Sequence, residues 1–285
     1  MTARTVEKTE IWSRLDPDIR EAIRVVSQVL PFRSNRYVVE ELIDWSRVPD
    51  DPMFQLTFPQ SDMLEPGAYR RVRDLLDAGD DEALAATVRE IRLSLNPHPA
   101  GQLTHNVPRL GGRPLPGLQH KYDETVLFFP ARGQTCHAYC TYCFRWAQFV
   151  KLPEMQFKAR ETADLVAYLK EHPEVSDVLV TGGDPLIMKT SMLRDYLEPL
   201  LTHELPNLRH IRIGTKSPAY WPQRFVTDDD ADDLLRLFEE VVASGRHLAL
   251  MAHYSHPVEL STPVARRAVR RIRETGAEVR TQAPL

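Results

Sequence analysis

The sequence has little of what would place it in a membrane, on nucleic acid or outside the cell. No stretch approaches the roughly 18 to 20 uncharged apolar residues that span a bilayer. Residues 1–10 mix charged side chains with threonine and lack the apolar core of a secretory signal. The formal net charge of −4 gives no general attraction to nucleic acid or to anionic lipid. We therefore expect neither a nucleic-acid partner nor membrane association.

Cysteine is also scarce. The 3 cysteines fall in one short run, at Cys136, Cys140 and Cys143. An odd number of closely spaced cysteines argues against a disulfide framework and favours a reducing compartment, so we expect a cytoplasmic protein. The remaining composition, 42% apolar and 27% charged over 285 residues, is that of an ordinary globular chain that can bury a sizeable core.

Residues 1–95 have the periodicity of helices, with apolar side chains that recur on one face. We expect helices or helical turns at residues 16–30, 37–45, 69–78 and 82–95. Proline and polar residues over 48–66 predict a connection between the second and third of these. Residues 96–120 are rich in proline and glycine and lose the helical period. There we expect an irregular connecting segment, which could be a linker or the wall of a pocket.

Residues 121–285 alternate short apolar runs with amphipathic stretches. The apolar runs predict strands at residues 126–129, 178–180, 211–213, 248–251 and 279–285. The stretches between them predict helices at residues 161–171, 192–201, 228–244 and 262–276. This alternation is typical of βαβ units around a parallel sheet. We expect an α/β fold, a partial parallel (β/α) barrel with a helical N-terminal region, whose ligands meet the carboxyl ends of the strands.

The cysteine run indicates a metal site. Closely spaced thiolates bind soft metals, and the candidates are zinc and an iron–sulfur cluster. A structural zinc site needs four protein ligands, for which His137 could supply the fourth. A [4Fe–4S] cluster held by three cysteines leaves one iron open to a substrate, as a chemically active cluster requires. We favour the cluster, with zinc and three inert thiols as the alternatives.

The spacing C-x3-C-x2-C, with Tyr142 just before the last cysteine, resembles the cluster motif of the radical S-adenosylmethionine superfamily. The flanking sequence is similar to the lysine 2,3-aminomutase-like branch of that superfamily over about residues 50–285. The segments that carry this similarity are DPMFQ (51–55), NPHPA (96–100), HKY (120–122), CFR (143–145), TGGDPL (181–186), IRIG (211–214) and HYSHP (253–257).

The resemblance implies a radical isomerase that moves an amino group on an amino acid. It implies that the three cysteines hold the cluster and that S-adenosylmethionine chelates the open iron. One electron then yields a 5′-deoxyadenosyl radical, which abstracts a substrate hydrogen. Tyr142, Gly182, Gly183 and Asp184 are expected to contact the cosubstrate. Glycine lets a backbone come close to a ligand, and a carboxylate can accept a hydrogen bond from an ammonium group.

The resemblance also assigns residues to the substrate and to a second cofactor. Arg145 matches the family arginine that holds the substrate carboxylate, a task that suits a guanidinium, although Trp146 departs from the basic residue usual at its position. Aminomutases of this branch use pyridoxal phosphate, and Lys121 and Tyr122 fall where family residues meet its phosphate. His253 is expected to line the cofactor site.

No position can be assigned as the lysine that forms a Schiff base with pyridoxal phosphate, or as the acidic pair that binds the substrate's side-chain amine. We therefore expect a chain truncated before the last barrel strand, a fragment of a longer enzyme. The alternatives are a radical enzyme that works without pyridoxal phosphate and a non-catalytic binding protein, zinc-stabilised or degenerate. Expected partners are an amino acid substrate and an electron donor such as flavodoxin or ferredoxin, and a homo-oligomer is compatible with the sequence.

Overall fold

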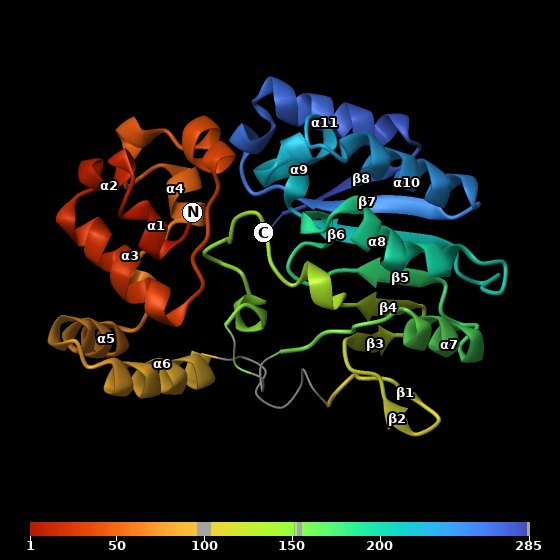
Figure 1. The fold of residues 1–285 in the computed structure, drawn as a ribbon, viewed down its shortest axis with the longest axis horizontal. Helices are drawn as coiled ribbons and strands as arrows, with labels where there is room; N and C mark the ends of the chain where they lie inside the picture. The colour runs from red at the N-terminus through yellow and green to blue at the C-terminus, as the bar shows by residue number, and fades with distance from the viewer. Residues whose placement is uncertain (96–103, 151, 153–155, 284–285) are drawn as a thin grey trace. The chain divides into compact units, whose positions relative to one another are not determined.

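The computed structural model describes residues 1–95, 104–150, 152 and 156–283 (Figure 1). The chain folds into two compact units, which comprise Met1–Pro99 with Ala138–Leu152, and Ala100–His137 with Pro153–Leu285. Residues 138–152, which sequence analysis assigned to the barrel region, thus belong to the first unit. Among the residues that the structure describes, every helix is too short or too polar to cross a lipid bilayer.

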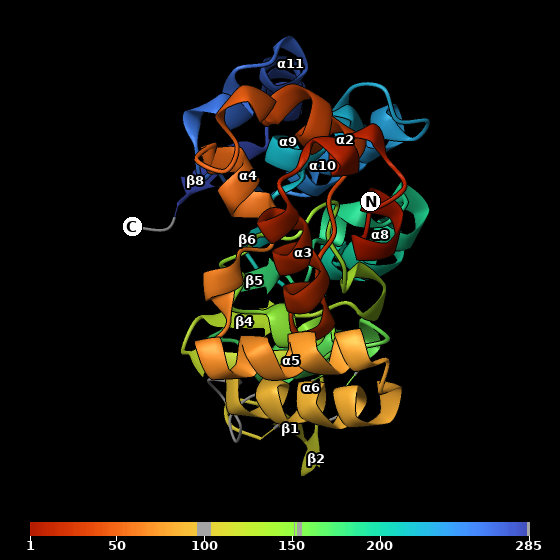
Figure 2. The ribbon, with the colours of Figure 1, turned by 90° about the vertical axis from the view of Figure 1, so that its left-hand side faces the viewer.

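The first unit consists of helices. They are α1 (Ala3–Val6), α2 (Glu10–Arg14), α3 (Pro17–Val29), η1 (Val38–Leu42), η2 (Trp45–Arg47), α4 (Pro52–Thr57), η3 (Ser61–Met63), α5 (Pro66–Ala78), α6 (Asp81–Leu95) and η5 (Trp146–Gln148). Helices α5 and α6 lie side by side (Figure 2) and pack with α3 around an aliphatic core that includes Val26, Val72 and Ile91. Burial of these faces, rather than helix propensity, provides most of the stability of such helices.

Three of the four predicted helical stretches correspond to α3, α5 and α6, and the stretch 37–45 contains the shorter π-helical η1. Helix α4 was not expected, because the sequence predicted only a connection there. Its start is explained by Asp51, whose carboxylate accepts a hydrogen bond from the Phe54 N–H at 2.8 Å, and by Pro52 at the first helical position. With 6 residues, α4 is too short for its periodicity to be recognised.

The second unit contains a six-stranded sheet in the order β3-β4-β5-β6-β7-β8 (Figure 1). Its strands are β3 (Leu118–Tyr122), β4 (Thr125–Phe128), β5 (Asp177–Val180), β6 (His210–Thr215), β7 (His247–His253) and β8 (Glu278–Gln282), and a separate hairpin is formed by β1 (Arg109–Leu110) and β2 (Arg113–Pro114). Strands β4 to β8 are parallel, whereas β3 pairs antiparallel with β4. The parallel sheet is confirmed. Closure into a barrel is not shown, since β3 and β8 are the edges of the described sheet.

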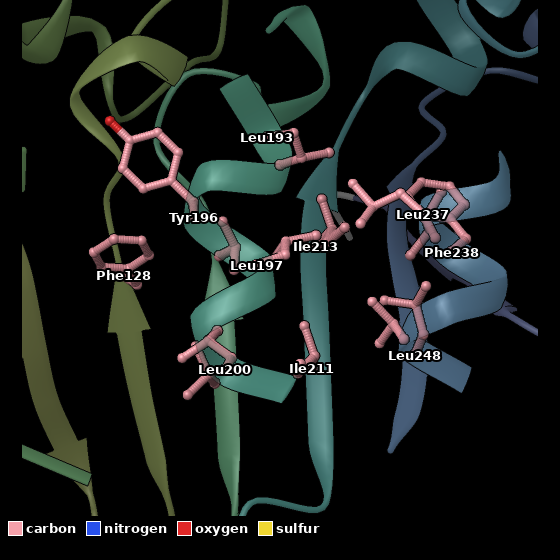
Figure 3. Close-up of a cluster of buried hydrophobic side chains, with 14 of the residues drawn as sticks. Phe128, Leu193, Tyr196, Leu197, Leu200, Ile211, Ile213, Leu237, Phe238 and Leu248 are labelled. Atoms are coloured by element: carbon pink, nitrogen blue, oxygen red, sulfur yellow. The ribbon is translucent and has the colours of Figure 1, made fainter. Parts of the chain in front are cut away.

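Helices between the strands cover one face of this sheet. They are α7 (Ala163–Glu171), α8 (Thr190–Leu197) continued by η8 (Glu198–Leu201), α9 (Ser217–Tyr220), α10 (Ala231–Ala243) and α11 (Pro263–Glu274), with the shorter η4 (Ala131–Gly133), η7 (Pro185–Ile187), η9 (Pro222–Phe225) and η10 (Pro257–Leu260). Figure 3 shows side chains of β4, β6 and β7, among them Phe128, Ile213 and Leu248, directed at α8 and α10. Alternate residues of the same strands, such as Leu127 and Met251, are only partly buried. The strands therefore have one fully covered face.

The segment 96–120, predicted to be irregular, contains short strands in its described part. Residues 96–103, and with them the NPHPA segment, lie outside the described residues. The remainder forms the β1–β2 hairpin and the start of β3. Strand β3 has the mixed sequence LQHKY and becomes a strand because it pairs with β4 across a two-residue turn. Such pairing depends on the partner strand, so periodicity within the segment does not show it.

A buried arginine joins the segments that precede α8 and α10. Arg224 is 3% exposed, and its guanidinium donates to the carbonyl oxygens of Leu186 (3.0 Å) and Met188 (3.1 Å). It also pairs with Asp230, which accepts a hydrogen bond from the Thr190 N–H at 2.6 Å. Burial alone would raise the pKa of Asp230, but the hydrogen bonds from Thr190 and the charge of Arg224 outweigh it and lower that pKa.

The Asp230→Asn variant is expected to lose about 1–3 kcal/mol of unfolding free energy at pH 7, because Arg224 loses its counter-charge. The folded-state pKa of Asp230 lies below the unfolded value. The carboxylate therefore stabilises the fold fully above the unfolded pKa, and this contribution is lost as the pH falls through the folded pKa. Urea unfolding at pH 7, 4 and 3 should show the difference between wild type and variant shrinking in acid.

The matched control is Asp195→Asn. Asp195 pairs with Arg132 at the surface, where both side chains are more than half exposed. Its loss should change the unfolding free energy by less than about 0.5 kcal/mol. A difference between wild type and Asp230→Asn that stays constant from pH 7 to pH 3 would contradict the role given to Asp230.

Candidate functional site

Gly182, Gly183 and Asp184 follow β5 and form a tight segment, here named the GGD turn. Gly182 has φ 145°, a conformation in which L side chains are strained. A Cβ atom at Gly183 would lie 2.4 Å from the backbone nitrogen of Thr135. Glycine is therefore required at both positions, and at Gly183 the reason is that the segment just before the first cysteine packs directly on the GGD turn.

The carboxylate of Asp184 is buried, at 2% exposure, and is occupied by protein donors. Oδ1 accepts hydrogen bonds from Leu186 N (3.0 Å) and Thr215 Oγ1 (2.8 Å). Oδ2 accepts from Lys216 N and from Ser217 Oγ, both at 2.9 Å. A carboxylate offers about four lone-pair sites, so these donors fill it. Within the described residues the backbone groups of the two glycines take part in no hydrogen bond, and Gly182 is buried while Gly183 is half-buried.

The Gly183→Ala variant is expected to lose about 1–3 kcal/mol of unfolding free energy, as in overpacked cores. The added Cβ would meet backbone atoms of Thr135, which cannot move aside as a flexible side chain can. Urea denaturation measures the loss. Gly67→Ala is the control, because a Cβ there has nothing within 4 Å, and it should be as stable as wild type or slightly more stable. Equal stability of the two variants would show that the close approach imposes no constraint.

Residues 138–152 carry the second and third cysteines and lie in the first unit. Backbone hydrogen bonds join this segment to the helical region, from Tyr139 N to Arg33 O (2.8 Å) and from Thr141 N to Leu56 O (2.9 Å). Thr141 also donates a hydrogen bond from its hydroxyl to the Gln55 carbonyl at 2.9 Å. The two residues are 86 positions apart in the sequence. Only the tertiary structure could place the segment.

Cys140 and Cys143 form a small turn, in which the Cys143 N–H donates to the Cys140 carbonyl at 3.1 Å. Burial, together with the neighbouring Cys140, raises the pKa of the Cys143 thiol to about 12, although the backbone N–H and the charge of Arg145 act in the opposite direction. Without a cation the Cys143 group therefore favours the neutral thiol, and a bound metal would supply the charge that a thiolate needs. The chemistry of this pair fits a soft metal.

A pocket of about 280 Å³ lies beside this turn within the first unit. It is lined by Leu30, Pro31, Met63, Leu95, Cys140, Thr141, Tyr142, Cys143, Phe144 and Trp146. Tyr142 is 40% exposed, and the Arg145 guanidinium carbon lies 5.1 Å from the exposed Phe144 ring. The structure thus brings Tyr142 together with two of the cysteines in a mainly apolar pocket.

Cys136 lies in the second unit, next to His137, whose ring stacks on Trp221 at 5.9 Å between centroids. In the parts of the chain that the structure describes, no three histidine, cysteine or acidic side chains converge as a metal site. The joint role of Cys136 with Cys140 and Cys143 therefore rests on their spacing in the sequence.

The strand ends next to the GGD turn hold a buried ion pair that sequence analysis did not assign. Lys216, directly after β6, donates to Glu259 Oε1 at 2.8 Å and to the carbonyl of His253 at 3.2 Å. Glu259 is 0% exposed. The sequence held one signal for it, since His256, Pro257 and Glu259 have the order of a capping box, which the structure confirms at η10.

Lys121 and Tyr122 lie at the opposite ends of the strands from the GGD turn. Tyr122 is opposite Thr125, the first residue of β4, whereas Phe128 at the other end of β4 is opposite Val180, just before the GGD turn. The two ends of β4 are separated by about 10 Å at the usual rise of a strand. Both side chains are exposed, with the Lys121 ammonium 5.5 Å from the Tyr122 ring centroid.

No family model matches the chain. A protein of Aquifex aeolicus named putative L-lysine 2,3-aminomutase is 33% identical over 267 residues, 93% of this chain and 59% of that protein. The L-lysine 2,3-aminomutase of Bacillus subtilis is 26% identical over 282 residues, 99% of this chain and 50% of the enzyme. The glutamate 2,3-aminomutase of Clostridioides difficile is 31% identical over 154 residues, 53% of this chain and 32% of the enzyme.

The first two similarities run along nearly the whole chain, including the cysteine run and the GGD turn, while the chain spans only about half to three fifths of these relatives. Both relatives bear the same aminomutase name. The chain therefore belongs to the lysine 2,3-aminomutase-like branch of the radical S-adenosylmethionine superfamily.

Proposed function

We propose that the chain holds the radical-generating part of a radical S-adenosylmethionine isomerase, a 2,3-aminomutase that moves an amino group on an amino acid. The observation that carries the proposal is the close packing of the GGD turn on the residues before Cys136. It joins, within one unit, the turn assigned to the cosubstrate and the start of the cysteine run. The similarity to named aminomutases supports the same class of reaction.

In this proposal Cys136, Cys140 and Cys143 hold a [4Fe–4S] cluster. With S-adenosylmethionine bound, the cluster supplies the electron that generates a 5′-deoxyadenosyl radical. Tyr142 lies in the pocket beside the two later cysteines, and its ring would shield the cluster from solvent. The backbone of Gly182 and Gly183 would accept from the cosubstrate's ammonium group, in a turn that Asp184 keeps in shape through its buried carboxylate.

The substrate would be an amino acid whose carboxylate pairs with Arg145, through the two parallel hydrogen bonds that a guanidinium can donate. The relatives are named for lysine and for glutamate, two amino acids that share the α-carboxylate and differ in the side chain. Arg145 thus serves the common part of the substrate. The proposed reductant is flavodoxin or ferredoxin, and the proposed location is the cytoplasm.

Pyridoxal phosphate is a separate part of the proposal. The family uses it to carry the migrating amino group, and Lys121 and Tyr122 match the residues that meet its phosphate. Their exposed position at the amino end of β4 adds no support to that role. A radical enzyme of this branch that works without pyridoxal phosphate is the alternative.

The test is anaerobic reconstitution of the chain with iron and sulfide, followed by S-adenosylmethionine and dithionite. The reconstituted protein should show iron–sulfur absorbance in the visible region. Its reduced cluster should give an electron paramagnetic resonance signal that changes when S-adenosylmethionine binds, and 5′-deoxyadenosine should be released. Zinc in place of iron, or no cluster, would refute the radical assignment. Adding pyridoxal phosphate and following its absorbance separates the aminomutase from the alternative that works without it.

A further inference from the structure

The segment at the carboxyl end of β6, formed by Thr215, Lys216 and Ser217 and named here the 215–217 turn, contacts the segments that follow β5 and β7. It does so through two buried carboxylates. Asp184, in the GGD turn after β5, accepts from all three residues of the 215–217 turn. Glu259, in the loop after β7, accepts from the Lys216 ammonium at 2.8 Å. The carboxyl ends of three neighbouring strands are therefore tied together at one turn.

The ammonium group of Lys216 is fully used in these contacts. Its three N–H groups meet Glu259 Oε1 (2.8 Å), Ser255 Oγ (3.1 Å) and the His253 carbonyl (3.2 Å). Its nitrogen also lies 4.3 Å from the centroid of the Tyr220 ring, within the range of a cation–π contact. An ammonium has three donors and no acceptor, so Lys216 has no donor left for a ligand. This saturation leaves the ammonium no hydrogen bond to donate to a substrate and points to a positioning role.

Glu259 completes the connection from the other side. Its Oε2 accepts from the backbone N–H groups of Ser255 (2.6 Å) and His256 (3.2 Å). The side chain is 0% exposed, and Lys216 is the cation paired with it. Residues 253–259, named here the 253–259 loop, thus curl around one carboxylate whose charge Lys216 balances. Removal of the ammonium would leave that carboxylate buried and uncompensated. Opening of the loop or uptake of a proton would relieve this cost, and either change weakens the hydrogen bonds that Glu259 accepts from Ser255 and His256.

We propose that Lys216 is a positioning residue for S-adenosylmethionine, which fixes the separation between the GGD turn and the 253–259 loop that carries His253. Its backbone N–H donates to Asp184 in the GGD turn, and its ammonium donates to Glu259 in the 253–259 loop. A single residue therefore contacts both segments. The inference rests on the proposed function, because it takes these two segments as walls of one cosubstrate site. It goes beyond that function by assigning a residue that would touch neither the cosubstrate nor the cluster.

The test compares Lys216→Met with Lys216→Arg, which keeps the charge, and with Lys170→Met. Lys170 pairs with Glu204 on the surface, where the two side chains are 45% and 67% exposed, and it controls for the loss of a lysine ion pair. Hydrogen exchange is first followed in the cluster-free chain. In Lys216→Met the Ser255 and His256 amides should exchange about tenfold faster or more, because Glu259 no longer holds them. Lys170→Met should exchange like wild type, and Lys216→Arg should exchange more slowly than Lys216→Met because it keeps the charge opposite Glu259.

Affinity for S-adenosylmethionine is then measured on the anaerobically reconstituted proteins by equilibrium binding, with iron content determined in the same samples. Lys216→Met should bind the cosubstrate about tenfold more weakly or worse while keeping its iron, as displaced supporting residues do elsewhere. Lys216→Arg should bind the cosubstrate more tightly than Lys216→Met, because it keeps the charge opposite Glu259. If Lys216→Met does not fold, Lys216→Met combined with Glu259→Gln removes both charges together and should show the same weakened binding.

Three results would overturn the inference. Wild-type affinity in Lys216→Met would refute the positioning role alone. A fall in iron content that parallels the fall in affinity would show a general structural role instead. A wild-type protein that forms its cluster but binds no S-adenosylmethionine would refute the proposed function, and with it this role of Lys216. If the Ser255 and His256 amides of Lys216→Met nevertheless exchange faster in that last case, the contacts of Lys216 are as described and only the proposed function is wrong.

Discussion

Replacing Cys140 with alanine is expected to abolish the cluster and all activity of the reconstituted protein. A [4Fe–4S] cluster with three protein ligands cannot be retained by two thiolates, and this loop offers no further cysteine. Iron content should fall to the background of the reconstitution procedure, and 5′-deoxyadenosine should not form. The effect is the largest of those expected because cluster assembly is lost entirely.

Thr141→Val provides the control for Cys140→Ala. It removes the hydroxyl bond to the Gln55 carbonyl, one residue along the same loop, and leaves every thiol in place. We expect this variant to keep its iron. A Cys140→Ala protein that retains iron and cleaves S-adenosylmethionine would refute the cluster assignment. Loss of iron in both variants would show that the loop, and not the ligand, was disturbed.

Replacing Asp184 with alanine is expected to cost about 3–5 kcal/mol of unfolding free energy. The side chain is 2% exposed, and its removal would leave the Leu186 and Lys216 amides and two hydroxyls buried without their acceptor. Urea denaturation of the cluster-free chain measures the loss independently of any cofactor. Asp184→Asn should lose less, because its amide oxygen still accepts from some of these donors.

Asp80→Ala is the matched control, since Asp80 also accepts from a backbone amide, that of Ala83 at 3.0 Å, but lies exposed at the start of α6. The expected loss there is about 1 kcal/mol, the usual effect of removing an N-cap. If Asp184→Ala were no more destabilised than Asp80→Ala, the buried network around the GGD turn would not have the structural role described above.

Much of the fold was accessible from periodicity. Helices α3, α5 and α6 and strands β4 to β8 coincide with predicted stretches, because each repeats an apolar pattern over enough residues to be recognised. Strand β3 and helix α4 were missed for two different reasons. β3 depends on pairing with β4, and α4 depends on a cap at Asp51 over a short segment. Neither cause produces an apolar period.

The candidate site divides in the same way. The cysteine spacing and the position of the GGD turn were evident in the sequence, since both are local patterns. The occupation of the Asp184 carboxylate by the 215–217 turn was not, because those donors lie more than 30 residues away. The Lys216–Glu259 pair spans 43 residues and was equally hidden. Long-range polar partners leave no periodic signal.

The sequence by itself determined the branch of the superfamily, the three candidate cluster ligands and the order of strands and helices, because these depend on residue identity and local spacing. The tertiary structure decided what those residues contact. It showed that both glycines of the GGD turn are required by close packing or strain, that Asp184 is a buried support, and that residues 138–152 join the helical unit. Such facts depend on distances between segments far apart in the chain, and only folding determines those distances.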